Sequence, residues 1–319
     1  MRRCLLPGFV LVAALGLAGC SASTTSTPPP TPQVLFVGNG YAVAAGNRAK
    51  IFYYGFPVTS TSTPGFTLVA GTATSALESF AQDALFDYVA DCTGGTIRAT
   101  LRPLTSASTQ AFALTAAGVG PDGIAVDASG NLYAGENCGN NHIDVWSAPV
   151  TSASVVSVSV FDATVTTKLP QQMVIDNVNH LLYVANYSAQ QVLQYSLPLT
   201  ITSTAAVKLT IAGANVGRGV AIDSGTNQLF VSDGQLNKIY VFNLPISGSN
   251  TPALTITTST TAQRFYNLAF DRAGNLYASE GVGSVISVFV PPFASSSNPA
   301  FSLAPTGIDS PWALNVGFP

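Results

Sequence analysis

Six polar residues recur along the chain every 45 to 52 residues, and each of them ends a short run of apolar and aromatic residues. These residues are Asn39, Asp91, Glu136, Asn186, Asp233 and Glu280. Carboxylate and amide oxygens brought together could coordinate Ca²⁺ or another divalent cation, or they could bind a small polar ligand. Alternatively, each side chain could accept hydrogen bonds from the backbone of its own loop. The residue types and their spacing leave both interpretations open.

Four further residues that suit ligand binding stand just before short apolar runs, and a histidine lies in the loop after Glu136. They are Arg218, Arg264, Tyr266, Trp312 and His142. We expect them to lie on the same face as the six polar residues, so that guanidinium groups, carboxylates and aromatic rings surround one candidate ligand-binding site. The other histidine, His180, lies in a turn that we expect on the opposite face. A two-histidine metal site is therefore not predicted.

A third polar series ends the runs GIAVD, QMVID, GVAID and NLAFD. Its members are Asp127, Asp176, Asp223 and Asp271. Each precedes a tight turn such as ASGN or RAGN, where an Asp side chain can accept backbone N–H groups. We therefore expect these four carboxylates to stabilise turns and not to act in catalysis. The sequence contains no GxSxG, HExxH or helix-linked phosphate-loop motif, so it predicts no catalytic residue.

The elements that position these residues are visible as an internal repeat. The runs LFVGN, DYVAD, LYAGE, LYVAN, LFVSD and LYASE are second strands, and each is followed by a third strand that closes with Pro. First strands precede the last four copies, and strands rich in Ser, Thr and Val close most copies. Four antiparallel strands in about 48 residues, without a helical period, are typical of a β-propeller. The sequence predicts an all-β fold with six four-stranded antiparallel blades.

The two ends of the repeat array predict how the ring closes. The first copy begins at its second strand, Val34–Asn39, and the C-terminal segment SPWALNVG resembles a first strand without the rest of its blade. Aligning the two patterns places Trp312 at the position of Ile124. We expect this segment to complete blade 1, because an open array would leave unpaired strand edges. The propeller is expected to span residues 34–319 and to be monomeric.

The N-terminus has the pattern of a secretion signal. Residues 1–19 combine a basic start with an apolar core that is too short for a membrane-spanning helix. The sequence Leu-Ala-Gly-Cys that ends at Cys20 resembles the bacterial lipoprotein lipobox, which implies cleavage before Cys20 and its lipidation with palmitate or similar acyl chains. Residues 20–33 are expected to form an extended tether. The implied location is the bacterial cell envelope, at the outer membrane in a Gram-negative host; a secreted soluble protein is the alternative.

Two cysteines remain in the predicted propeller. Cys92 and Cys138 follow the ends of second strands in adjacent blades, and the cell envelope is an oxidising compartment. We expect a disulfide between them. Two free thiols or a metal-binding pair are the alternatives, although two thiols without nearby histidines make a poor zinc site.

Composition argues against several classes of partner. The chain has 12 Lys and Arg, 15 Asp and Glu, a formal net charge of −3 and only 8% charged residues. Because the basic residues are scattered, neither nucleic-acid binding nor electrostatic attachment to anionic lipid is expected. The predicted contact with a membrane is limited to the N-terminal lipid.

The repeats resemble the six-bladed NHL and SMP-30/gluconolactonase-like propellers, and LYVAN and LFVSD also resemble the YVTN repeat. In the lactonase group a Glu, an Asn and an Asp bind a divalent metal. Asp233 matches that Asp, whereas the region of Arg218 replaces the Asn and the Glu has no identifiable counterpart. A metal-dependent lactonase, hydrolase or lyase is therefore the alternative function. The favoured function is a lipid-anchored binding or scaffold module for a protein, a glycan or a small ligand, without a cofactor.

Overall fold

The computed structural model describes residues 33–40, 49–72, 75–115, 120–137, 141–165, 169–214, 216–248, 251–259, 264–281, 283–304, 307 and 310–318. Within these residues the chain forms 24 β-strands in six four-stranded antiparallel sheets and no helix. Accordingly, this part of the chain contains no helix that could cross a membrane. The predicted signal peptide, the predicted tether up to residue 32 and Cys138 lie outside the described residues.

Each sheet forms one blade, whose four strands follow one another from the inside of the ring outward. Blade 1 contains β24 (Pro311–Gly317), β1 (Val34–Asn39), β2 (Lys50–Gly55) and β3 (Phe66–Val69). Blade 2 contains β4 (Leu77–Gln82), β5 (Phe86–Asp91), β6 (Thr96–Leu101) and β7 (Gln110–Thr115). Blade 3 contains β8 (Pro121–Val126), β9 (Leu132–Glu136), β10 (Ile143–Trp146) and β11 (Val158–Val160).

The other three blades follow the same pattern. Blade 4 contains β12 (Pro170–Asp176), β13 (Leu181–Asn186), β14 (Gln191–Ser196) and β15 (Val207–Thr210). Blade 5 contains β16 (Val216–Asp223), β17 (Gln228–Asp233), β18 (Lys238–Asn243) and β19 (Leu254–Thr257). Blade 6 contains β20 (Phe265–Phe270), β21 (Leu276–Glu280), β22 (Ile286–Phe289) and β23 (Phe301–Leu303).

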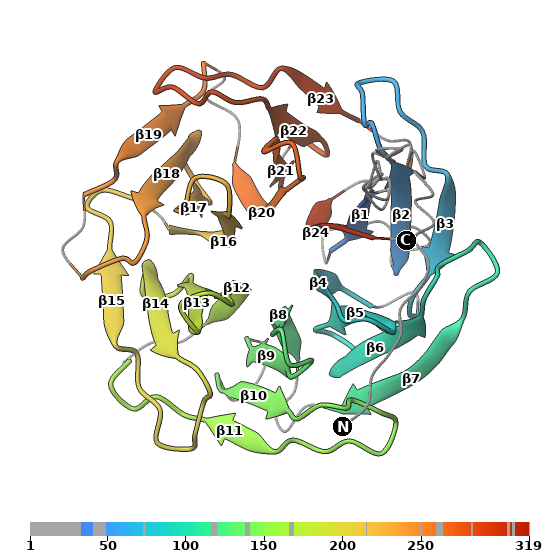
Figure 1. Ribbon diagram of the computed structural model, residues 1–319. Helices are drawn as coiled ribbons and strands as arrows, with labels where there is room; N and C mark the ends of the chain where they lie inside the picture. Colours follow the sequence, from blue (N-terminus) through green and yellow to red (C-terminus); the bar gives the residue numbers. More distant parts are fainter. Residues whose placement is uncertain are drawn as a thin grey trace, which may run out of the picture. The chain divides into compact units, whose positions relative to one another are not determined.

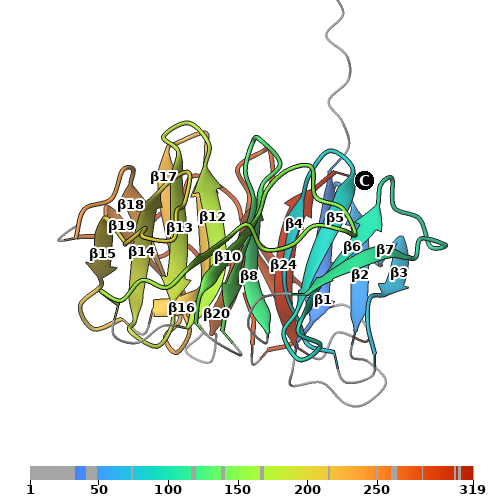
Figure 2. The same cartoon turned by 90° about the horizontal axis from the view of Figure 1, so that it is seen from below.

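The six blades surround a central axis, which confirms the predicted six-bladed β-propeller (Figure 1). The innermost strands are β24, β4, β8, β12, β16 and β20, and seen from the side the strands of adjacent blades stand next to one another (Figure 2). One end of the propeller carries the turns between first and second strands, and we call it the turn face. The other end carries the loops between second and third strands and the connections between blades, and we call it the connector face.

The C-terminal strand closes the ring as predicted, because β24 pairs antiparallel with β1 along its length. The predicted alignment of Trp312 with Ile124, however, is wrong by two residues. Ile124 pairs with Ala134, which stands two positions before the last residue of the second strand of blade 3. In blade 1, the residue that pairs with the corresponding position is Leu314. A two-residue shift keeps every side chain on the same face of a strand, so the residue pattern does not reveal it. Trp312 therefore corresponds to Asp122.

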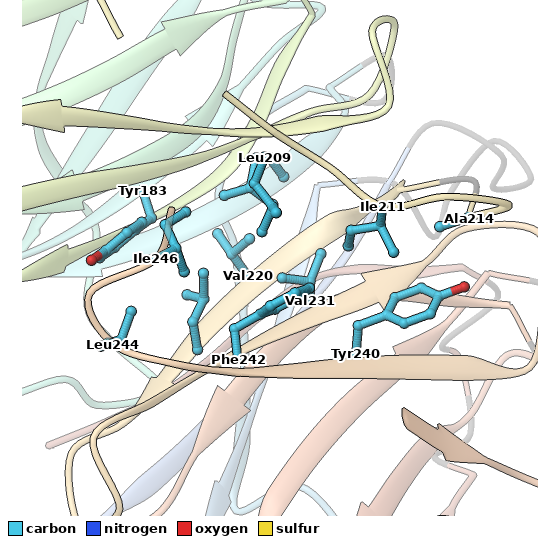
Figure 3. Packing of buried hydrophobic residues seen from close by; sticks show 13 residues of the cluster. Tyr183, Leu209, Ile211, Ala214, Val220, Val231, Tyr240, Phe242, Leu244 and Ile246 are labelled. Atoms are coloured by element: carbon cyan, nitrogen blue, oxygen red, sulfur yellow. The ribbon is translucent and has the colours of Figure 1, made fainter. Parts of the chain in front are cut away.

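The hydrophobic core lies between neighbouring blades. Between blades 4 and 5, for example, Tyr183 and Leu209 pack with Val231 and Phe242, and all four side chains are buried (Figure 3). Both faces of each sheet are covered in this way, so the second strands read as continuous apolar runs and not as an alternating pattern. Each such side chain contributes about 1.5–3 kcal/mol on burial, which holds the strand ends in fixed positions.

The predicted turn-stabilising role of the four Asp residues is confirmed at the turn face. The Asp127 carboxylate accepts hydrogen bonds from the backbone N–H groups of Ser129 and Asn131, both at 2.9 Å, and from the hydroxyl of Tyr133 at 2.9 Å. The other three carboxylates accept equivalent bonds within their own turns; they belong to Asp176, Asp223 and Asp271. These residues therefore have a sufficient structural reason for their positions.

Candidate functional site

The six polar residues that end second strands lie at the connector face, but their side chains are buried between blades. Along β17, for example, Leu229, Val231 and Asp233 share one side of the strand because side chains alternate, and the first two pack against blade 4. The exposed fractions are 0% for five of the six residues and 4% for Glu280. The six side chains therefore face the preceding blade, one strand outward from the axis, and do not form a single cluster.

Five of these six side chains are engaged in hydrogen bonds within the protein. The Asp91 carboxylate accepts a serine hydroxyl at 2.6 Å and a loop N–H at 2.9 Å, and it pairs with Arg98 at 2.8 Å. The Asp233 carboxylate, our candidate metal ligand, accepts two loop N–H groups at 2.9 and 2.7 Å and the hydroxyl of Tyr240 at 3.0 Å. Blade connections or neighbouring strands bind the side chains of Asn39, Asn186 and Glu280.

Glu136 differs from the other five residues of this series. It is fully buried, and neither oxygen of its carboxyl group has a hydrogen-bond partner among the described residues. Burial raises the pKa of the Glu136 carboxyl to about 8, with a further contribution from Asp144. Asp144 lies on the adjacent strand β10, also fully buried, and accepts the hydroxyl of Ser159 at 2.6 Å. Glu136 is therefore protonated at neutral pH.

A second set of six residues converges on the axis at the connector face. In each blade, one residue of the innermost strand lies opposite the last residue of the second strand. Directly after that residue, the register between the two strands is irregular in all six blades. Bulges of this kind re-aim a side chain. Within these irregular stretches, the residues two positions before the partner of the second strand's third-last residue are, in the order of the blades, Trp312, Glu78, Asp122, Gln171, Arg218 and Tyr266. We call these six residues the ring.

One half of the ring is aromatic and cationic. The Arg218 guanidinium carbon lies 4.4 Å from the ring centroid of Trp312, 4.9 Å from that of Tyr266 and 5.3 Å from that of Tyr187. Trp312 and Tyr266 also contact each other edge to face, with centroids 5.7 Å apart. Arg218 of blade 5 thus reaches across blade 6 to blade 1. Guanidinium–aromatic contacts of this kind are each worth about 0.5–2 kcal/mol and hold the side chain in place.

Two glycines make room for the aromatic side chains. A Cβ atom on Gly281 would lie 2.0 Å from the ring of Tyr266, and one on Gly40 would lie 2.4 Å from the ring of Trp312. Both glycines directly follow the last residue of a second strand. The aromatic rings therefore rest on bare backbone, which no other residue type would allow without a shift.

The other half of the ring is acidic and is almost completely buried. The exposed fractions of Glu78 and Asp122 are 6% and 4%. Asp122 Oδ2 accepts hydrogen bonds from the amides of Asn137 at 2.6 Å and Gln171 at 2.7 Å. Burial raises the pKa of Asp122 to about 6, although these amides and Arg218 oppose the rise. Burial, followed by the charge of Asp122, raises the pKa of Glu78 well above its usual range, and Arg218 counteracts this.

Amide side chains next to the ring connect the innermost strands. Gln172 Oε1 accepts the backbone N–H groups of Val220 at 3.1 Å and Leu268 at 2.9 Å, and its Nε2 donates to the Leu268 carbonyl at 2.8 Å. Asn267 Nδ2 donates to the backbone carbonyl of Glu78 at 2.8 Å. These bonds tie the innermost strands of blades 4, 5, 6 and 2 together. The ring is therefore built on a rigid floor.

Of the residues predicted to bind ligand, the structure brings Arg218, Tyr266 and Trp312 together in the ring. Arg264 is exposed at the connector face, and His142 lies toward the outer strand, where Nδ1 is 3.2 Å from the Ser159 hydroxyl. The sequence analysis missed the acidic half, which consists of Glu78 and Asp122 together with the neutral amide of Gln171. Cys92 is buried, and its predicted partner lies outside the described residues, so the disulfide stays a prediction.

The turn face offers grooves between blades but fewer available polar groups. Two of them have volumes of about 570 and 320 Å³ and lie between blades 5 and 6 and between blades 2 and 3. Their carboxylates include Asp223, Asp271 and Asp127, which are committed to the turns. Within the described residues, no group of three or more His, Cys, Asp or Glu side chains is arranged to hold a metal ion.

No family model matches the sequence, and no curated protein matches it either. Similarity appears among solved structures. A chain of a nidogen/laminin complex is 13% identical, with a TM-score of 0.63 that covers 89% of this chain and 98% of that one. A proposed 6-phosphogluconolactonase from Bacteroides uniformis is 14% identical, with a TM-score of 0.60 and coverage of 86% and 83%.

A protein of unknown function from Bacteroides caccae is also similar, with 12% identity, a TM-score of 0.61 and coverage of 90% of this chain and 99% of that one. Identities this low show a shared fold and do not carry over a site or an activity. The chain is thus a six-bladed β-propeller in which cationic, acidic and aromatic side chains meet at the ring.

Proposed function

We propose that the protein is a binding module that captures a small polar ligand at the ring. The observation that carries this proposal is the state of Arg218. Its guanidinium is held by three aromatic side chains, yet it donates no hydrogen bond among the described residues. A guanidinium has five N–H donors in a planar fork that suits carboxylate or phosphate.

A purely structural role would leave this arrangement unexplained. Within the described residues, ion pairs shorter than or equal to 4.0 Å join Arg98 to Asp91 and Arg102 to Asp87, and none joins Arg218 to the ring carboxylates. Arg218 is partly exposed, whereas Glu78 and Asp122 are buried, and buried carboxylates that served only stability would be expected to pair with it directly. Opposite charges held apart on a rigid floor suit a ligand that bridges them.

The location of the protein forms part of the same proposal. We propose that the chain is cleaved before Cys20, lipidated there and anchored to the bacterial cell envelope through residues 20–32, which extend to at most about 45 Å. Gln33 lies on the turn face, where its side chain accepts the backbone N–H of Arg272 at 2.9 Å. Radiolabelled palmitate incorporation that survives Cys20→Ala would contradict this.

Thermal-shift screening of the purified protein tests the binding proposal. The panel contains sugars, sugar acids, carboxylic acids, nucleotides and amino acids, and hits are measured by calorimetry. Arg218→Met keeps the length of the side chain but removes its charge and donors, so it should weaken binding of a hit at least about 10-fold. Arg272→Met, on the exposed turn face, is the matched control and should bind as wild type does. The proposal fails if no compound binds, or if Arg218→Met binds every hit as tightly as wild type.

A further inference from the structure

The arrangement of charge in the ring points to the chemical class of its ligand. We propose that the ring binds a zwitterion that carries a carboxylate and an ammonium group a few ångströms apart, as an amino acid or the end of a peptide does. This inference rests on the proposed function, since it concerns the same residues. It specifies which group of the ligand each half of the ring holds.

The cationic half is suited to the carboxylate. The ring centroids of Trp312, Tyr266 and Tyr187 lie within 5.3 Å of the Arg218 guanidinium carbon, so aromatic side chains hold the group in place. Two parallel N–H groups of a guanidinium bind both oxygens of a carboxylate.

The acidic half is suited to the ammonium group. The Glu78 carboxylate accepts no hydrogen bond among the described residues although the residue is only 6% exposed. The two amides that bind Asp122 both donate to Oδ2, which leaves Oδ1 available for a further donor. An ammonium group supplies three donors and a positive charge to two adjacent acceptors. A neutral hydroxyl would supply one donor and leave the buried charge uncompensated.

The charge balance of the ring favours a ligand without net charge. Glu78 and Asp122 are buried and interact electrostatically, and burial raises the pKa of both carboxyls, so the pair resists carrying two negative charges. Arg218 carries one positive charge and opposes this rise. A zwitterion adds no net charge to these groups, whereas a divalent cation would be repelled by Arg218 and a dianion by the carboxylates.

The experiment compares amino acids with their singly blocked forms. The twenty standard amino acids are screened by thermal shift at about 10 mM, and the strongest binder is then titrated by calorimetry beside its N-acetyl and C-terminal amide derivatives. Each derivative lacks one of the two charged groups, so each should bind at least about 10-fold more weakly.

Two variants separate the halves of the ring. Arg218→Met should remove the preference for the free acid over the amide, and Glu78→Gln should remove the preference for the free amine. Unfolding transitions measured alongside establish that both variants fold. The zwitterion assignment is overturned if no amino acid binds or if the blocked forms bind as tightly as the free one. If sugars or simple acids bind in an Arg218-dependent manner instead, the proposed function survives and only the ligand class is wrong.

Discussion

Replacing Glu136 with Gln tests whether an acid without a hydrogen-bond partner is buried between blades 2 and 3. Glu136 is surrounded by protein atoms, and its carboxyl oxygens have no hydrogen-bond partner among the described residues. Gln has the same shape but cannot ionise, and its amide can donate toward the nearby carboxylate of Asp144. The substitution therefore removes the titration of the group while leaving the packing in place.

The magnitude follows from the difference between the pKa of Glu136 in the folded chain, about 8, and its ordinary value of 4.5. Below the lower value both folded and unfolded chains hold the proton, and stability is complete. Between the two values only the unfolded chain ionises, so the free energy of unfolding falls by about 1.4 kcal/mol for each pH unit of increase. From pH 5 to pH 8 the loss is roughly 3–4 kcal/mol, a large part of the stability of a typical domain.

Urea denaturation followed by tryptophan fluorescence at about pH 5 and about pH 8 measures this effect. Wild type should lose stability between the two conditions, and Glu136→Gln should lose roughly 3–4 kcal/mol less. Asp122 and Asp87, whose pKa burial raises to about 7, titrate in both proteins. We therefore compare the loss of stability of wild type with that of Glu136→Gln, so that these shared contributions cancel. Asn186→Ala, at the same repeat position in blade 4, is the control. It should lower the free energy of unfolding by the same amount at both pH values.

The reasoning is refuted if wild type and Glu136→Gln show the same change between the two pH values. Such a result would mean that water or a cation reaches the carboxylate and stabilises its charged form. A variant that is less stable than wild type at both pH values by an equal amount would likewise show that Glu136 acts through packing and hydrogen bonds alone.

Three further predictions concern the ring, its support and the disulfide. Gly281→Ala should displace the aromatic side chain of Tyr266 and weaken ligand binding measured by calorimetry. Gly55→Ala is the control and should leave binding unchanged, because a Cβ there meets nothing within 4 Å. Equal binding by both variants would contradict the geometry of the ring. Gln172→Leu loses three hydrogen bonds across the axis and should lower the free energy of unfolding by about 3 kcal/mol in urea denaturation; a change below about 1 kcal/mol would be inconsistent with a rigid floor. Reduction should raise the mass of the protein by two hydrogen atoms if Cys92 and Cys138 are linked, and an unchanged mass would exclude the disulfide.

Much of the fold is predictable because its signals are local. The second strands and their closing prolines repeat at nearly constant spacing, and Asp127 and its equivalents precede recognisable turns. The first strand of blade 2, β4, is the exception. Its sequence LESFAQ is followed by Asp83 at the repeat position of Asp127, but Gln82 stands where the other first strands have an apolar residue before the Asp, and the strand with Glu78 was missed. Asp83 accepts backbone N–H groups of its turn as Asp127 does.

The candidate site depends on features that no single stretch of sequence contains. The sequence by itself determined the blades, their number and the strand that closes them, because strand period and turn chemistry involve residues close together in the chain. Tertiary structure alone decided which polar residues face the axis. A strand-end residue such as Asp233 turns toward the neighbouring blade, whereas Glu78, Asp122 and Arg218 are aimed inward by backbone irregularities in three different blades. Their meeting is set by closure of the ring and by strand register, which are properties of the whole assembly of sheets and not of any one repeat.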